Sequence, residues 1–229
     1  PRPPPPPPPP PAPPPPPPPA APPPARGIAL HALWGDEVHI LIVTEGCSSQ
    51  YPDHPEMVLQ KKSEAKEAAA ILGVPPDKLH FEGLPDMRLD SVPATRINKS
   101  IETVIQSVQP SIVYTHASSD VNLDHRLVFE ASLVACRPYA APFVEAIYSY
   151  FAPSSTEWGI APFDANHFVD VSSVMETKIN AMAAYKSEVR TAPHPRSIES
   201  LHAIFATFGS VVGCQYAEAF KLVRSVHRD

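Results

Sequence analysis

A ten-residue stretch near the middle of the chain is dense in side chains that can move protons or bind a metal. It holds His116, Asp120, Asn122, Asp124 and His125. A neutral imidazole nitrogen is a good zinc ligand, and a neighbouring carboxylate can orient the ring. The stretch also fits an ordinary loop, in which Asn122 or Asp120 caps the next helix and Asp124 is favoured in its first turn. One histidine does not make a metal site, because zinc takes about four ligands.

Two other polar residues follow segments that read as strands. Glu45 comes after the apolar run at 38–43, which places it at the rim of any pocket beyond that strand. Arg88 follows a strand at 79–82 and could contact a substrate, although an ion pair with Asp86 or Asp90 is the simpler expectation.

A third polar group lies between two predicted helices near the C-terminus. His194 sits between two prolines, which restricts its backbone, and Arg196 could present its planar fork to a carboxylate or phosphate. The simpler interpretation is that Pro195 and Ser197 begin the next helix.

The elements that must position these residues alternate along the chain. Apolar residues that recur with a period of 3.6 predict helices, and continuous apolar runs predict strands. Flanking Gly, Pro and capping residues mark where these elements begin and end. Ser173 and Glu176 have the spacing of a capping box. The expected strands are 37–43, 79–82, 112–115, 143–150 and 167–171, and the expected helices are 25–33, 53–72, 97–108, 123–136, 173–189, 197–208 and 217–226.

This alternation predicts a Rossmann-like three-layer α/β/α fold with a mostly parallel sheet. In such sheets ligands bind beyond the carboxyl ends of the strands. The sequence has no glycine-rich phosphate-binding loop, which argues against a nucleotide-binding enzyme, and no nucleophile elbow, which argues against a serine hydrolase. It also has no internal repeat.

Composition excludes several classes of partner and compartment. The net charge of −6 argues against binding to nucleic acid or to an anionic membrane, and no apolar run approaches the roughly 20 residues of a membrane span. Three widely spaced cysteines indicate a reduced, cytoplasmic protein without disulfides. The oligomeric state, a homo-oligomer included, stays open.

Residues 1–24 contain 20 of the 33 prolines and divide the chain into a proline-rich tail and one domain at 25–229. Such a run favours a polyproline helix and has almost no amide donors for a sheet. It could bind a partner domain with an aromatic groove, or be a solvated tail without a partner.

Several separated segments together resemble the LmbE-like, or PIG-L, de-N-acetylases. The segment 122–126, Asn-Leu-Asp-His-Arg, follows a strand that ends in Thr115-His116 and is similar to the second motif of that family. The resemblance covers about residues 25–229 and implies a Rossmann-like fold. The other matching segments, in the order of the family, are 25–46, 85–90, 153–159, 194–197 and 213–220.

The resemblance implies a hydrolase that removes N-acetyl groups from amino sugars or related glycosides with the help of Zn²⁺. By the same resemblance His125 is a zinc ligand. Some relatives place a histidine in this pocket to steady the oxyanion. Catalytic roles are then expected for Asp124, His116 and Asn122, and contacts with substrate for His194, Arg196, Arg88, Asp120 and Glu45.

The chain departs from the family upstream of residue 25. The motif resembling Ala-His-Pro-Asp-Asp-Glu, which supplies two further zinc ligands and the general base, does not occur in the sequence. Without a metal to lower the pKa of water and a carboxylate to remove its proton, we expect nearly all activity to be lost. Without the family's first strand, we expect two strand edges to face a gap in the sheet.

Three interpretations of the sequence follow. The chain is a zinc deacetylase by ancestry whose N-terminus is damaged or misread, since a GC-rich gene read in a shifted frame yields proline and alanine runs. Alternatively, it is a catalytically dead protein that binds a sugar without metal, or an interaction protein whose proline tail recruits a partner.

Overall fold

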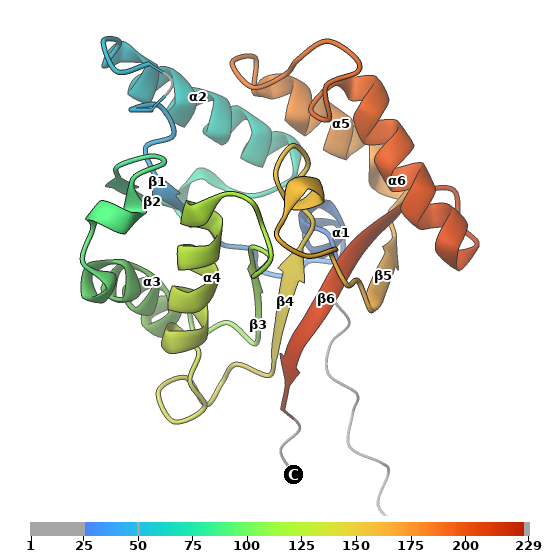
Figure 1. Cartoon of the computed structure of the whole chain (residues 1–229). Helices are drawn as coiled ribbons and strands as arrows, with labels where there is room; N and C mark the ends of the chain where they lie inside the picture. The colour runs from blue at the N-terminus through green and yellow to red at the C-terminus, as the bar shows by residue number, and fades with distance from the viewer. Residues whose placement is uncertain (1–25, 50, 227–229) are drawn as a thin grey trace, which may run out of the picture.

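The computed structural model describes residues 26–49 and 51–226 (Figure 1). Every element predicted before residue 213 has the predicted type and lies close to its predicted place. The helices are α1 (Ile28–Leu33), α2 (Glu56–Ile71), α3 (Ala94–Val108), α4 (Leu123–Ala135), α5 (Met175–Ala184) and α6 (Ile198–Val212); the strands are β1 (Ile40–Thr44), β2 (Leu79–Leu84), β3 (Ile112–Thr115), β4 (Ala146–Tyr150), β5 (His167–Asp170) and β6 (Ala217–Ser225).

The strands form a central layer that is covered by helices on both faces, as predicted for a Rossmann-like α/β/α fold. Side chains of α3 and α4 pack together with Leu41 and Val43 of β1 and with Ile147 of β4. On the opposite face, Ala69 of α2 packs with Ile40 of β1. The alternation of neighbouring β1 residues between the two faces is the expected pattern for a strand buried on both sides.

The central layer consists of two hydrogen-bonded sheets rather than one. Strand β1 pairs in parallel with β2, and a second sheet has the order β3-β4-β6-β5. Within the described residues, no backbone hydrogen bond joins β1 to β3. Both strands therefore lie at the edges of their sheets.

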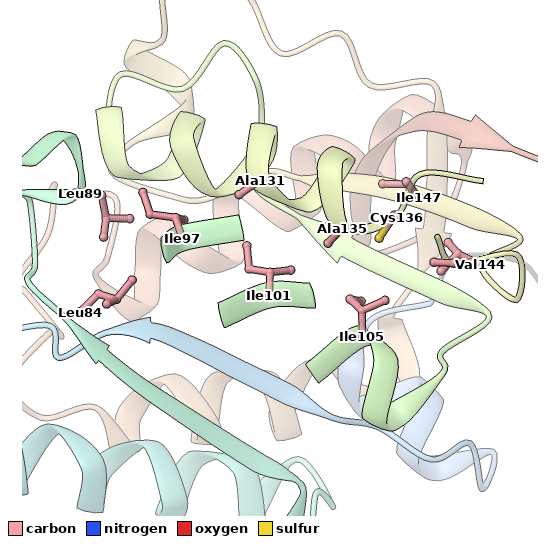
Figure 2. Packing of buried hydrophobic residues seen from close by; sticks show 11 residues of the cluster. Leu84, Leu89, Ile97, Ile101, Ile105, Ala131, Ala135, Cys136, Val144 and Ile147 are labelled. Atoms are coloured by element: carbon pink, nitrogen blue, oxygen red, sulfur yellow. The ribbon is translucent and has the colours of Figure 1, made fainter. Parts of the chain in front are cut away.

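An apolar core, rather than a hydrogen-bond ladder, holds the two sheets together. Figure 2 shows that side chains from the end of β2, from α3, from α4 and from β4 converge in one cluster. Its fully buried members include Leu89, Ala135 and Ile147, each 0% exposed. Burial of this apolar surface is what stabilises the contact between the sheets.

The prediction of a helix at 217–226 is wrong. This segment is β6, which pairs antiparallel with both β4 and β5. Its sequence, AEAFKLVRS, consists largely of good helix formers. Pairing on both sides and burial of Ala217, Ala219 and Phe220 override that preference and also add the antiparallel part of the sheet.

The predicted capping box at Ser173 and Glu176 is also wrong. Residues 172–174 form a 3₁₀ turn, α5 begins at Met175 without a side-chain cap, and the helix ends at Ala184 instead of 189. The start of α6 is as expected, because the Ser197 hydroxyl accepts a hydrogen bond from the Ser200 amide.

The predicted proline tail, the strand it is expected to replace and the domain boundary at Ala25 lie outside the described residues. In the part of the chain that the structure describes, no helix is long and apolar enough to cross a membrane.

Because the core cluster joins the two sheets, we expect Ile147→Ala to reduce the free energy of unfolding by about 3 kcal/mol. Leu59→Ala is the matched control, since Leu59 on α2 is 73% exposed and should change stability little. Urea unfolding measures both. Equal effects of the two substitutions would contradict this account of the core.

Candidate functional site

The polar stretch at 116–125 lies at the carboxyl end of β3 and runs into α4. Asn122 caps this helix: its side-chain oxygen accepts a hydrogen bond from the Asp124 amide, 2.9 Å away. This is the capping role that an ordinary loop would give it. The cap fixes the turn from which Asp124 and His125 project.

Asp120 is the buried anion at the centre of this turn. Its side chain is 0% exposed, and it accepts hydrogen bonds from the Asn122 amide at 2.8 Å, from the Thr156 hydroxyl at 2.8 Å and from the Ser155 hydroxyl. Its Oδ2 lies 3.2 Å from Nδ1 of His125. Burial alone would raise the pKa of Asp120, but the hydrogen bonds from His125, Ser155, the Asn122 amide and Thr156 outweigh it and hold that pKa well below its usual range.

The Asp120 carboxylate sets the tautomer of His125. An ionised carboxylate can only accept, so Nδ1 of His125 carries a proton and, in the neutral ring, Nε2 keeps its lone pair. The imidazole is stacked on that of His116, with 3.9 Å between ring centroids and 8° between planes. Such a lone pair can take a proton from water or bind a metal ion.

His116 is a neutral imidazole at neutral pH. Burial, followed by the neighbouring His125, lowers the pKa of His116 to about 3. Its Nε2 lies 3.1 Å from the Tyr150 hydroxyl, whose pKa is raised by burial, and its Nδ1 is buried without a hydrogen-bond partner among the described residues. When Tyr150 donates to Nε2, Nδ1 carries a proton that no protein acceptor uses.

Three carboxylates lie beside this pair: Glu45 and Asp86 follow β1 and β2, and Asp124 is in the first turn of α4. Asp124 accepts from the amide of Leu89 at 3.0 Å, and Asp86 accepts from the Thr44 hydroxyl at 3.1 Å. Burial raises the pKa of both aspartates, and Glu45 adds to the shift of Asp86. Glu45 accepts from the Ser48 amide through Oε1. One oxygen each of Glu45 and Asp124 is buried without a partner in the described part of the chain.

The expected ion pair between Arg88 and Asp86 or Asp90 is absent from residues 26–49 and 51–226. Asp86 turns toward Thr44 instead, and the amide of Arg88 faces the Asp124 carboxylate. Among the described residues, the exposed Arg88 side chain therefore forms no ion pair.

Arg196 and His194 belong to a neighbouring cluster. Arg196 forms an ion pair with Glu188, which also pairs with Lys61 of α2, and the Arg196 amide donates to Nδ1 of His194 at 3.1 Å. Lys61 lies within electrostatic reach of Asp86, so this cluster adjoins the carboxylates. Glu188 engages Nη1 of Arg196, whereas the buried Nε of the same guanidinium has no partner among the described residues.

Sequence reasoning missed four residues that complete the site: Asp86, Tyr150, Ser155 and Thr156. Asp86 and Tyr150 stand where strands β2 and β4 end, the same signal that identified Glu45. Ser155 and Thr156 lie in the segment 153–159 that resembles the family, but their role could not be found from it, because their partner Asp120 is 35 and 36 positions away.

The residues present fit a zinc ion only in part. His125, with its Nδ1 held by a carboxylate, has the arrangement usual for a metal-binding histidine. Among the described residues, however, no group of three or more His, Cys, Asp or Glu side chains could hold a metal ion. We therefore assign no chemical step to a metal.

Residues 25–136 match the family model of PIG-L, described as GlcNAc-PI de-N-acetylase. The chain contains a PIG-L domain. The resemblance found in the sequence is thereby confirmed for the segment that contains His116, Asp120 and His125.

Known proteins extend the similarity beyond the PIG-L match. Diacetylchitobiose deacetylase of Thermococcus kodakarensis is 28% identical over 214 residues, which cover 84% of this chain and 74% of the relative. The N,N'-diacetylchitobiose deacetylase structure from Pyrococcus horikoshii has a TM-score of 0.68 at 20% identity, covering 86% of this chain and 76% of the other. GalB, a 4-carboxy-2-hydroxymuconate hydratase from Pseudomonas putida, has a TM-score of 0.65 at 23% identity, covering 88% and 90%. The structural similarities establish the fold alone.

The buried charge of Asp120 predicts a pH-dependent effect of Asp120→Asn. At neutral pH the variant places an amide against Nδ1–H of His125, and we expect a loss of about 2 kcal/mol of stability. Because the folded pKa is lower than the unfolded one, the charge stabilises the fold above the unfolded pKa and this contribution disappears as the pH falls.

The difference between wild type and Asp120→Asn should therefore shrink by about 1 kcal/mol between about pH 6 and about pH 3, measured by urea unfolding. Asp164→Asn is the control, because the Asp164 side chain is 79% exposed. A difference that does not change with pH would show that the charge of Asp120 is not what stabilises the turn.

Proposed function

We propose that this PIG-L domain hydrolyses the N-acetyl group of an amino sugar or a related glycoside. The observation that carries the proposal is the Asp120–His125 pair, in which the carboxylate orients the His125 ring against the neutral His116. The diacetylchitobiose deacetylase among its relatives supports the class of substrate. In the reaction, water adds to the acetyl carbonyl carbon, the C–N bond breaks, and acetate and a free amine leave.

We assign the proton-handling or cation-binding position to Nε2 of His125, whose side chain is 24% exposed, and we give the buried His116 the role of holding that ring by stacking on it. Asp120 is then a positioning residue that holds His125. The sequence predicted instead that Asp120 contacts the substrate. Its burial supports this, since a carboxylate that is 0% exposed cannot reach a substrate directly.

Asn122 and Asp124 act in this proposal by holding loops. Asn122 caps α4, and Asp124 ties the loop after β2 to the start of that helix through the Leu89 amide. We also propose that Glu45 and Arg88 contact the substrate. Arg196 and His194 belong to a cluster that adjoins the carboxylates, because Lys61 pairs with the same Glu188 as Arg196 and lies within electrostatic reach of Asp86.

The test is acetate release from N-acetylglucosamine glycosides, together with zinc per chain after removal and reloading of the metal. We expect His125→Ala to reduce acetate release at least about 100-fold, and to remove any stoichiometric zinc. His54→Ala is the matched control, because His54 is an exposed histidine that pairs with Glu56 on α2. If the wild-type chain is folded but releases no acetate, the proposal that it is a hydrolase is wrong.

A second candidate is a protein that binds N-acetylated sugars without hydrolysing them. The incomplete set of metal ligands in the described residues favours it. It requires saturable sugar binding that His125→Ala weakens, with neither zinc above background nor acetate release. Stoichiometric zinc together with turnover would exclude it.

A further inference from the structure

Two strands in the middle of the central layer each have one edge without a hydrogen-bonded neighbour. Within the described residues, β1 pairs only with β2, and β3 pairs only with β4. The backbone hydrogen bonds just beyond these strands run the same way: the Glu45 amide donates to the Leu84 carbonyl, and the Glu145 amide donates to the Ser111 carbonyl. The amide and carbonyl groups on the other edge of β1 and of β3 are therefore available to a further strand.

The two edges adjoin the same apolar core. Leu41 and Val43 of β1 and Val113 of β3 all pack against the cluster formed by α3, α4 and β4. The Leu89 amide, in the loop after β2, donates to Asp124 at the start of α4, so the carboxyl ends of the strands on both sides lie at the same end of the layer. We call the facing edges of β1 and β3, residues 40–44 and 112–115, the β1–β3 junction.

Both strands of the junction are more exposed to solvent than a strand that has neighbours on both sides. Every residue of β1 is only partly buried, and so are Ile112, Val113 and Tyr114 of β3. In β4, which lies between β3 and β6, every residue before Tyr150 is buried. Because helices cover β1 on both faces, its exposure is explained by the lack of a strand beside it.

The sequences of these two strands are typical of interior strands. β1 is Ile-Leu-Ile-Val-Thr and β3 is Ile-Val-Tyr-Thr, and neither contains a charged residue or a proline. The strands at the outer edges of the layer do carry charges, Glu82 in β2 and Asp170 in β5. Proteins use charged residues and prolines to keep exposed edges from pairing, so their absence from β1 and β3 indicates a place for another strand.

The carboxyl end of the junction is acidic. Glu45 follows β1 directly, and Asp124 and Asp86 lie beside it. Among the described residues, Oε2 of Glu45 and Oδ2 of Asp124 are buried acceptors without a hydrogen-bond partner. A lysine or arginine at this end of an inserted segment would donate to these oxygens, and such charge-assisted hydrogen bonds are strong.

We propose that the β1–β3 junction binds an extended segment of another polypeptide, which pairs with both strands and completes the sheet. The segment is apolar, free of proline, as long as the five-residue β1, and ends in a basic residue. Residues 1–24 of this chain do not fit, because 20 of them are prolines, which lack the amide hydrogen that strand pairing needs. The inference is independent of the proposed function, since it concerns backbone pairing and not the chemistry of His125.

The test is amide hydrogen exchange of the full chain, followed by NMR, with and without the synthetic peptide Lys-Val-Ile-Val-Ile-Val-Lys. In the free chain, we expect the edge amides of β1 and β3 to exchange at least about tenfold faster than the amides of β4. The peptide should slow them by about tenfold and leave β5, an outer edge strand, unchanged. The control is the same peptide with its valines N-methylated, which keeps the side chains but removes the amide donors along one edge, and it should have no effect.

Three results would overturn the inference. If the edge amides of β1 and β3 are as protected as those of β4 in the free chain at every protein concentration, the junction is already closed. If their protection rises with protein concentration, a second copy of the chain occupies the junction. If the N-methylated peptide protects them as well as the unmodified one does, binding does not depend on strand pairing.

Discussion

The buried carboxylate of Asp120 is the constraint on which the candidate site depends. A charge that is removed from water is costly unless donors surround it. Here the donors come from three different places: the Asn122 amide in the same turn, the hydroxyls of Ser155 and Thr156 after β4, and Nδ1 of His125 on α4. One anion therefore fixes the relative positions of two loops, a helix and the imidazole that can do chemistry.

The second constraint is the interruption of the sheet between β1 and β3. Three of the buried polar atoms that have no hydrogen-bond partner among the described residues, Nδ1 of His116 and one oxygen each of Glu45 and Asp124, belong to segments that border these two strands. Packing of Leu41 and Val43 against the common core keeps β1 in place without hydrogen bonds to β3. Burial of apolar side chains thus holds the two sheets together at the place where these polar atoms of the site, among the described residues, make no hydrogen bond.

The same fold serves deacetylation in the Pyrococcus horikoshii enzyme and hydration in GalB, so the architecture by itself does not select a reaction. Selection comes from the side chains at the strand ends. In this chain the strand ends carry a carboxylate-oriented His125 stacked on the neutral His116, and these side chains rather than the fold are the basis of the proposed hydrolysis.

Local patterns in the sequence determined most of the elements and the position of the polar turn. The strand at 112–115 and the helix that follows it could be predicted because apolar runs, capping residues and prolines act over a few positions. The density of His and Asp at 116–125 and the family resemblance likewise come from contiguous residues. Helix formers misled the prediction at 217–225, because partners on β4 and β5 decide that this segment is a strand.

Tertiary structure alone decided the roles within the site. Nothing near Asp120 in the sequence shows that Ser155 and Thr156 hold it, or that its carboxylate is turned from solvent toward His125. Likewise, only the fold shows that Glu188 engages Arg196 and that no anion engages Arg88 within the described residues. The physical reason is that periodicity and capping act through neighbours along the chain, whereas burial, pKa shifts and hydrogen bonds depend on groups that meet only after folding.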